Sequence, residues 1–276
     1  VKDHVVNYFK ALYTEENIEQ DMTQDDTIPI GLFQDLLNTD FAKLTQEYSD
    51  VEIEATLRDM HARKAPGSDG FQALFYQKNW HLISPPLLEM VHKALDGKGF
   101  PEGLNNTNIV VIPKVPNLEY ITQFRPIGLC NVAYKIISKV LVNLIKKVLP
   151  HFISETQSRF VPGRQITDNI VVFQEIIHTM RKSKKGTGLM AIKIDLEKAY
   201  DRLRWDFIHE TLSDMGFPIL MTDTIMECVT TAKLCVLWNG EPTTQFTPSR
   251  GVRQGDPLSS YLFVMCLEKL QQAIDA

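Results

Sequence analysis

Apolar and polar positions follow two different periods along this chain, and together they predict a mixed fold. Apolar residues recurring every three or four positions predict helices near residues 4–14, 50–65, 84–95, 131–149, 168–182, 204–215 and 257–274. Short apolar runs rich in β-branched residues predict strands at 108–116, 188–195 and 233–240. Asp50 is a plausible N-cap for the helix over 50–65. Because helices and strands do not alternate strictly, the pattern predicts an α+β fold without repeated βαβ units.

Composition excludes several classes of protein. The chain has 276 residues and is 44% hydrophobic, which suits a globular protein with a large core or two subdomains. No apolar run approaches the roughly 18 residues that cross a bilayer, and the N-terminus has no signal-peptide pattern. We therefore expect an intracellular protein, nuclear or cytoplasmic, with no membrane partner, and nothing in the sequence indicates a homo-oligomer. Four cysteines without a CxxC pair are expected to be reduced core residues: Cys130, Cys228, Cys235 and Cys266.

Charge is distributed unevenly along the chain. Residues 1–60 carry 4 basic and 14 acidic side chains, whereas residues 61–193 carry 18 basic and 8 acidic ones. Residues 194–276 are acidic again, with 7 basic and 12 acidic side chains. The basic middle block is either a solvated face or a surface for nucleic-acid phosphates, and charge alone leaves both interpretations open.

The segment 188-GLMAIKID-195 ends a predicted buried strand with a carboxylate, Asp195. An acid at this place either caps the next helix or faces a crevice in which ligands bind. Tyr200 and Asp201 follow in the pattern D-x-x-x-A-Y-D. That spacing suits a polymerase, in which the acid binds a magnesium ion that bridges phosphates and the aromatic ring borders the sugar pocket.

Five motifs, taken in order, resemble one known family. The segment 192-IKIDLEKAYDRLRW-205 resembles the first palm motif of the reverse transcriptases of non-LTR (LINE-type) retrotransposons, in the form common in plant elements. The segment 251-GVRQGDPLSSYLF-263 resembles the second palm motif of the same enzymes. Three earlier segments resemble amino-terminal and fingers motifs of that family: 63-RKAPGSDGF-71, residues 112–143 and 157-QSRFVPGRQITDNI-170. The resemblance covers about residues 50–276.

The resemblance implies a right-hand polymerase fold, with fingers and a partial palm. Residues 50–187 would form fingers with a basic surface, residues 188–276 a partial palm, and residues 1–49 an acidic helical linker before the domain. The implied reaction is RNA-templated DNA synthesis by two-metal nucleotidyl transfer. Its partners would be an RNA template, a DNA primer and deoxynucleoside triphosphates.

The resemblance also implies roles for single residues. Asp195 would be the catalytic acid and would bind Mg²⁺, assisted by the backbone carbonyl of Leu196. Nucleotide binding is implied for Lys114, Arg125, Tyr200, Gln254 and Gly255. Within this set Lys114 and Arg125 would bind the triphosphate, and Tyr200 would limit the space near the sugar 2′ position. Asp256, directly before a proline, is expected to cap the last helix rather than bind metal.

Four basic residues are candidates for contact with nucleic acid: Lys64, Arg164, Lys184 and Lys185. Each also has an ordinary structural interpretation, because Lys64 and Arg164 lie beside Pro-Gly turns and residues 181–188 look like a solvated hairpin tip. Arg159 stands where the family often has glycine, which leaves the local backbone conformation open.

One part of the family's catalytic centre is missing from these 276 residues. The other metal-binding acids of the family are two adjacent aspartates in an aromatic-x-Asp-Asp hairpin beyond the second palm motif. The pair Asp25-Asp26 lies in a polar segment and is rejected as a substitute. We therefore expect a truncated reverse transcriptase with little or no polymerase activity. A non-catalytic, nucleic-acid-binding remnant of a retroelement is the alternative, and a product without a role also stays open.

Overall fold

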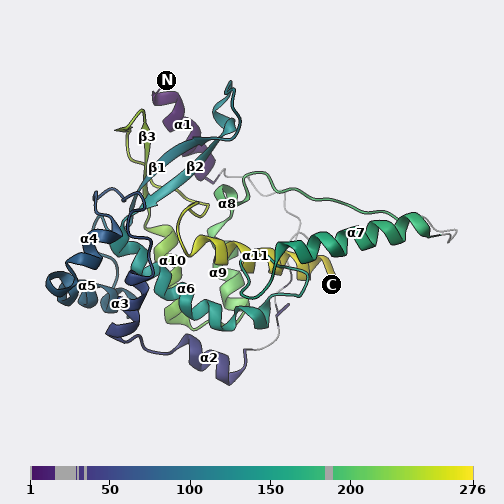
Figure 1. Ribbon diagram of the computed structural model, residues 1–276, viewed down its shortest axis with the longest axis horizontal. Helices are drawn as coiled ribbons and strands as arrows, with labels where there is room; N and C mark the ends of the chain where they lie inside the picture. Colours follow the sequence, from purple (N-terminus) through teal and green to yellow (C-terminus); the bar gives the residue numbers. More distant parts are fainter. Residues whose placement is uncertain (1, 16–28, 30, 34–35, 184–188, 276) are drawn as a thin grey trace.

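Helices make up about half of the described residues and pack with one small sheet. The computed structural model describes residues 2–15, 29, 31–33, 36–183 and 189–275. In chain order the helices and strands are α1 (Lys2–Tyr13), α2 (Asn38–Leu44), α3 (Asp50–Arg58), α4 (Ala73–Lys78), α5 (Trp80–Leu95), β1 (Asn106–Pro113), the 3₁₀ turn η1 (Ile121–Gln123), β2 (Phe124–Cys130), α6 (Val132–Phe152), α7 (Ile166–Lys182), α8 (Ala199–Arg202), α9 (Trp205–Asp214), α10 (Ile219–Thr230), β3 (Lys233–Trp238), β4 (Glu241–Pro242) and α11 (Ser259–Asp275). The predicted α+β class is confirmed (Figure 1).

The four strands form a mixed sheet in the order β2-β1-β3-β4. Strands β1 and β2 are antiparallel, with Val110 opposite Ile127. Strand β3 lies parallel to β1 on its other side, with Ile109 opposite Val236, and β4 pairs antiparallel with β3. The sheet therefore joins residues from both sides of the predicted division between 50–187 and 188–276.

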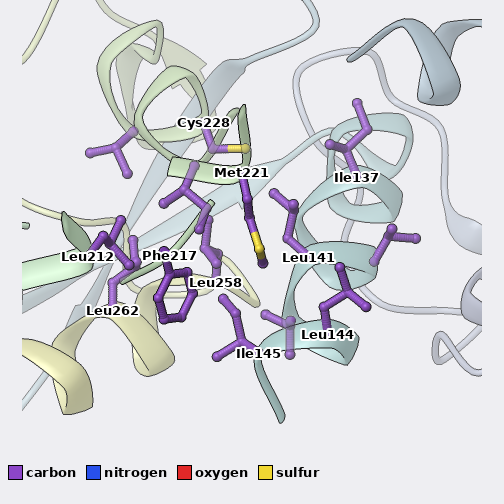
Figure 2. Packing of buried hydrophobic residues seen from close by; sticks show 14 of the residues in the cluster. Ile137, Leu141, Leu144, Ile145, Leu212, Phe217, Met221, Cys228, Leu258 and Leu262 are labelled. Carbon is purple, nitrogen blue, oxygen red and sulfur yellow. The ribbon is translucent and has the colours of Figure 1, made fainter. Parts of the chain in front are cut away.

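Helix α6 is the centre of the main hydrophobic core. Its amphipathic pattern predicts a helix over 131–149, and the structure extends it to Phe152. Fourteen of its residues are buried, so the helix is covered on most sides by α2, α3, α5, α10 and α11. Figure 2 shows Ile137, Leu141 and Ile145 of α6 facing Met221, Phe217 and Leu258 across this core.

Local chemistry moves the ends of α3 away from the predicted ones. The helix begins after Ser49 rather than at an Asp50 cap, because the Ser49 hydroxyl accepts from the Glu52 amide while the Glu52 carboxylate accepts from the Ser49 amide. It ends at Arg58 instead of residue 65. There the side-chain amide of Gln77 donates to the carbonyl oxygens of Leu57 and Met60. These hydrogen bonds take the place of the backbone hydrogen bonds that a further helical turn would make.

Helix α1 belongs to the segment predicted to be a linker, and it packs on the sheet. Its buried side chains form a second core with β1 and β3: Val5, Phe9, Leu12 and Tyr13 lie among Ile109, Leu234, Val236 and Phe246. Figure 1 shows the helix beside β1 and β3.

The predicted buried strand at 188–195 is wrong. The described residues 189–196 have no regular secondary structure, and Ile192 and Ile194 are 73% and 70% exposed. A strand needs a hydrogen-bonded neighbour, and the described sheet places none beside this segment. Figure 1 shows α7 projecting from the body and the segment returning along it to α8.

Two further sequence predictions concern the membrane and the cysteines. Within the described ranges, no helix combines the length and the apolar character that crossing a membrane requires. All four cysteines are free thiols, and Cys130, Cys228 and Cys266 are buried, as expected of core residues. Burial raises the pKa of the Cys266 thiol to about 12, so it stays protonated and unreactive at neutral pH.

Candidate active site

The loop of residues 250–258, which leads into α11, passes very close to two other stretches of backbone. Gly251 has a φ of +85°, and a Cβ there would lie 2.5 Å from the carbonyl oxygen of Asp201. Gly255 has a φ of +114°, and its Cβ would lie 2.6 Å from the carbonyl oxygen of Gly128. Both positions therefore require glycine, for its conformation and for its size.

Backbone hydrogen bonds hold the 250–258 loop in this position. The Val252 amide donates to the carbonyl of Tyr200 at 2.8 Å, and the Gly128 amide donates to the carbonyl of Gln254 at 2.7 Å. The second palm-like motif is therefore attached on one side to the first palm-like motif and on the other to β2.

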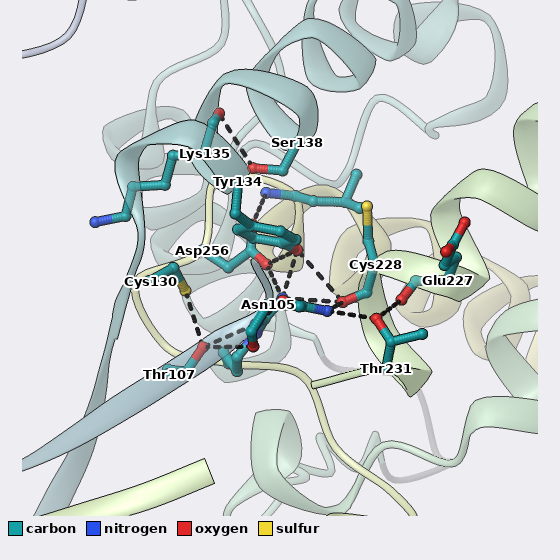
Figure 3. Close-up of polar contacts among 12 residues, drawn as sticks. Asn105, Thr107, Cys130, Tyr134, Lys135, Ser138, Glu227, Cys228, Thr231 and Asp256 are labelled. Atoms are coloured by element: carbon teal, nitrogen blue, oxygen red, sulfur yellow. Dashed lines mark hydrogen bonds and ion pairs between the residues drawn. The ribbon is translucent and has the colours of Figure 1, made fainter. Parts of the chain in front are cut away.

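Arg253 attaches the same loop to the structural elements that pack against it. Its side chain is buried, at 7% exposure for the residue, and its guanidinium pairs with Asp256 at 2.8 Å and lies 4.5 Å from the centre of the Tyr134 ring. It also donates to the side chains of Asn105 and Thr107 and to the carbonyl of Cys228. Figure 3 shows these acceptors gathered around Tyr134 and Asp256. A buried charge needs such partners, so the network ties the loop to β1, α6 and α10.

Asp256 is fully engaged by the protein. One carboxylate oxygen accepts from the Leu258 amide at 3.0 Å, just before α11 begins, and the other accepts from Arg253 and from the Tyr134 hydroxyl. Burial raises the pKa of Tyr134 well above its ordinary value, so the hydroxyl remains a donor. The carboxylate thus stabilises the turn directly before α11, and it bonds an amide that precedes the helix. A capping role for Asp256 stays a prediction.

Gln254 lies beside Asp201, the second aspartate of the D-x-x-x-A-Y-D segment. The Gln254 Nε2 atom is 3.3 and 3.4 Å from the two carboxylate oxygens, and the Tyr13 hydroxyl donates to one of them at 2.8 Å. Asp201 is 2% exposed, and desolvation raises its pKa despite these donors. The positive charges of Lys198 and, more weakly, of Lys114 act in the opposite direction on this pKa.

Tyr200 stacks on Phe263 of α11. The two ring centroids are 4.6 Å apart and the planes are inclined by 24°. The half-buried ring therefore has a defined position at the junction of α8 and α11.

Lys114 and Arg125 lie at the end of the β1/β2 hairpin where residues 114–123 connect the two strands. Arg125 pairs with Ile112 across the strands, and the Lys114 amide donates to the Gln123 carbonyl at 2.8 Å. The Lys114 ammonium also donates to the carbonyl of Thr122 at 3.3 Å. Both cationic side chains are exposed, so they remain accessible to an anion.

Asp195 and Leu196 lie in the exposed segment 189–196. Among the described residues, the Asp195 carboxylate has no hydrogen-bond or ion-pair partner. The structure therefore brings Gln254 and Asp201 into contact. It shows no such contact for Asp195 among the described residues.

Lys64 and Gly255, which are far apart in sequence, border one groove of about 330 Å³. Its lining includes several basic or imidazole side chains: His61, Lys64, Lys135 and Lys139. The 66–70 turn is held there by Asn131, whose side-chain oxygen accepts from the Asp69 amide at 3.2 Å. A Cβ on Gly67 would lie 2.4 Å from the Asn131 amide nitrogen, so this turn also depends on a glycine.

The other nucleic-acid candidates have different surroundings. The Arg164 guanidinium donates to the carbonyl oxygens of Ile153, Ser154 and Gln157. These hydrogen bonds stabilise the turns of the chain that follow α6. Lys184 and Lys185 lie outside the described residues.

Comparison with known proteins identifies the family. Residues 112–276, more than half of the chain, match the model of the family described as "Reverse transcriptase (RNA-dependent DNA polymerase)". This chain belongs to the reverse transcriptase family. The match includes the β1/β2 hairpin end, the D-x-x-x-A-Y-D segment and the 250–258 loop, and it begins after α1.

Similar curated proteins come from retrotransposable elements, as the resemblance implies. The chain is 27% identical over 270 residues to the transposon TX1 uncharacterized 149 kDa protein of Xenopus laevis, which is 97% of this chain and 20% of that protein. It is 24% identical over 210 residues to the Pol polyprotein of the type-2 retrotransposable element R2DM of Drosophila melanogaster, 76% of this chain and 19% of that protein. A Pol polyprotein of a type-1 R2 element of Nasonia vitripennis is 27% identical over 202 residues, 73% of this chain and 19% of that protein. The chain thus spans about a fifth of the length of these relatives.

Reverse transcriptases generally use divalent metal ions, and we tested whether the side chains present fit such a site. The structure as described contains no group of three or more His, Cys, Asp or Glu side chains that could hold a metal ion. Asp195 with the Leu196 carbonyl is too small a ligand set for two hard cations, which take about six oxygen ligands each. The side chains described here therefore do not fit a two-metal centre.

Sequence reasoning missed Tyr13, Asp201 and Arg253 as residues that shape this reverse transcriptase site. Asp201 and Arg253 are charged residues inside the quoted motifs, and charged residue types do not by themselves indicate burial. Tyr13 gave no comparable signal, because it lies 188 positions away from the acid to which it donates.

Proposed function

We propose that this chain contributes the fingers and part of the palm of a non-LTR retrotransposon reverse transcriptase, which copies RNA into DNA from deoxynucleoside triphosphates. Residues 50–187 would be the fingers and residues 188–276 the partial palm. RNA template, DNA primer and nucleotides would be the substrates.

One observation carries this proposal. The two palm-like motifs are joined by the Val252–Tyr200 backbone hydrogen bond and by the contact of Gln254 with Asp201. The β1/β2 hairpin, whose connecting end carries the exposed side chains of Lys114 and Arg125, is joined to the 250–258 loop by the Gly128–Gln254 backbone hydrogen bond. A triphosphate needs cations and a nucleotide base needs a hydrogen-bonding group, and this arrangement offers both within one region.

In this proposal Lys114 and Arg125 bind the triphosphate from the exposed hairpin end. Arginine can engage two phosphate oxygens at once, whereas lysine provides a point charge. Gln254 and Gly255 form the floor of the nucleotide pocket, and Tyr200 limits the space near the sugar 2′ position. The stacking of Tyr200 on Phe263 supports this role, because a ring in a defined position can exclude a hydroxyl group.

The groove beside Gly255 suits a nucleic-acid strand. Lys64 and Lys135 supply positive charge there, while Lys139 is paired with Asp59. Arg164 is a weaker candidate than Lys64, because its donors already bind three carbonyl oxygens. Lys184 and Lys185 remain proposed contacts for which the described structure provides no test.

For the metal we propose only that Asp195, with the Leu196 carbonyl, contributes ligands to Mg²⁺. The side chains described here do not complete a metal centre, and no catalytic step is derived through the ion. We accordingly expect these 276 residues alone to show little or no polymerase activity.

Nucleotide binding tests the function directly. We expect the 276-residue chain to bind a fluorescent dATP analogue, and we expect Lys114→Ala and Arg125→Ala each to weaken binding by about tenfold or more, since each removes a charged contact. Lys78→Ala, which removes an exposed lysine from α4, is a suitable control and should leave binding unchanged.

Primer extension separates the catalytic from the non-catalytic interpretation. Magnesium-dependent incorporation that is lost in Asp195→Ala but kept in Asp223→Ala, an exposed acid of α10, would contradict the expected inactivity. Salt-dependent RNA binding without nucleotide binding would instead favour a nucleic-acid-binding remnant. Absence of both kinds of binding would refute the proposal.

A further inference from the structure

Helix α1 contacts both palm-like motifs although it lies outside the region that matches the reverse transcriptase family model. The Tyr13 hydroxyl donates to Asp201 at 2.8 Å. The Tyr13 carbonyl accepts from the Ser249 amide at 2.8 Å, and the Leu12 carbonyl accepts from the Arg250 guanidinium at 3.0 Å. The last turn of α1 therefore holds the two residues directly before the second motif and an acid of the first.

A second tyrosine of α1 contacts the first motif independently. The Lys198 ammonium donates to the Tyr8 hydroxyl and lies 4.9 Å from the centre of its ring. Lys198 has a φ of +52°, an unusual conformation for lysine, and it directly precedes α8. The helix thus contacts the D-x-x-x-A-Y-D segment at both Lys198 and Asp201.

The contacts of α1 reach Gln254 through Asp201. A glutamine side chain can turn either its oxygen or its nitrogen toward a neighbour, because the two ends of the amide are similar in size. An ionised carboxylate only accepts, so Asp201 selects the orientation in which Gln254 Nε2 points toward it, at 3.3 and 3.4 Å. The Tyr13 hydroxyl donates to the same carboxylate and holds it in place.

This orientation determines what Gln254 can offer to a ligand. With Nε2 turned toward Asp201, the Oε1 atom has no protein partner among the described residues. Gln254 is only partly buried, so this oxygen is available as an acceptor. Tyr13 and Gln254 donate to Asp201, and the positive charges of Lys198 and Lys114 act on it from further away, so these groups all favour the ionised acid.

We propose that Tyr13 and Asp201 are positioning residues that fix the Gln254 side chain with its oxygen toward the incoming nucleotide or its template base. Helix α1 then helps to position the side chains of the nucleotide pocket and is not only a linker. The inference rests on the proposed function, because it assumes that Gln254 borders a nucleotide pocket.

Tyr13→Phe tests the inference with little change in packing, because it removes the hydroxyl and keeps the ring. We expect it to weaken binding of the fluorescent dATP analogue about fivefold, and Asp201→Asn to weaken it about tenfold, since an asparagine can turn a donor toward Gln254. Combined with Gln254→Ala, neither change should have a further effect, because their effect passes through that side chain.

Tyr48→Phe is the matched control. The Tyr48 hydroxyl also donates one hydrogen bond, to the Val140 carbonyl at 2.7 Å, but it lies in the α6 core. We expect Tyr48→Phe to lower thermal stability without changing nucleotide affinity. If Tyr13→Phe behaves in the same way, or if its effect adds to that of Gln254→Ala, Tyr13 has only a structural role and the inference is wrong.

A second readout does not depend on nucleotide binding. The side-chain amide signal of Gln254 in a nitrogen-15 NMR spectrum of the whole chain should shift in Tyr13→Phe and in Asp201→Asn, and not in Tyr48→Phe. An unchanged signal would overturn the inference even where nucleotide binds. If the two variants show the shift but the wild-type chain binds no nucleotide, the proposed function is refuted, and with it the part of the inference that concerns the nucleotide.

Discussion

Replacing Gly251 by alanine tests how tightly the second palm-like motif is held. At Gly251 a Cβ would lie 2.5 Å from the Asp201 carbonyl oxygen and 2.9 Å from its carbonyl carbon, which is closer than nonbonded contacts allow. Gly240, in the turn between β3 and β4, has a similar φ of +81°, but a Cβ there would meet no atom of the described residues within 4 Å. The two glycines therefore have similar φ angles, but only Gly251 has backbone atoms close to the position of an added Cβ.

The magnitudes follow from that difference. A left-handed conformation costs an alanine about 1–2 kcal/mol, and this cost applies to both variants. Gly251→Ala must in addition displace backbone atoms, which adds about 1–3 kcal/mol as in other overpacked sites. Taking about 3 °C per kcal/mol for a chain of this size, Gly240→Ala should lower Tm by about 3–6 °C and Gly251→Ala by about 6–15 °C.

Thermal unfolding followed by circular dichroism measures both shifts. Binding of the fluorescent dATP analogue, measured well below Tm, should be weakened in Gly251→Ala and unchanged in Gly240→Ala, because only the first displaces the backbone that carries Gln254. Equal Tm shifts in the two variants would refute the steric argument and would indicate that the loop moves freely away from Asp201.

Three further predictions concern stability and association. Arg253→Met should lower the free energy of unfolding by about 3–5 kcal/mol, because it leaves the buried Asp256 without its ion-pair partner. The double variant Arg253→Met/Asp256→Asn should lose less stability, and urea denaturation of both variants measures the difference. Burial raises the pKa of Asp201 above its ordinary value of 3.8, so the native state binds this proton more tightly. The contribution of Asp201 to the free energy of unfolding should therefore fall as pH rises above about 4. Urea unfolding between pH 4 and 7 should show this as a change with pH in the stability difference between wild type and Asp201→Asn. The exposed apolar face of α7 should promote self-association. The double variant Ile170→Ser/Phe173→Ser should therefore show less association in sedimentation velocity. Val51→Ser, which changes an isolated exposed residue of α3, should not.

Helix α6 shows where sequence patterning is sufficient. Its apolar positions recur at helical spacing over more than five turns, and the predicted range 131–149 differs from the observed Val132–Phe152 by a few residues at its ends. The same reasoning correctly predicted the other long helices and the strands β1 and β3. Helix α10 was missed.

The segment at 188–195 shows where patterning fails. Its apolar residues have the composition of a strand, but a strand is made by hydrogen bonds to a neighbour that the local sequence does not contain. In the described structure Ile192 and Ile194 are exposed, and Asp195 has no described partner. The prediction of a buried strand was wrong for this physical reason.

The sequence by itself determined the long helices, the glycine positions of the 250–258 loop and the family to which the chain belongs, because each depends on residues that are close together along the chain. Tertiary structure alone decided which groups meet. Tyr13 donates to Asp201 across 188 positions, and Arg253 reaches Asn105 across 148. Such contacts depend on how helices and strands pack, and the packing of distant segments leaves no periodic signal in the sequence around either partner.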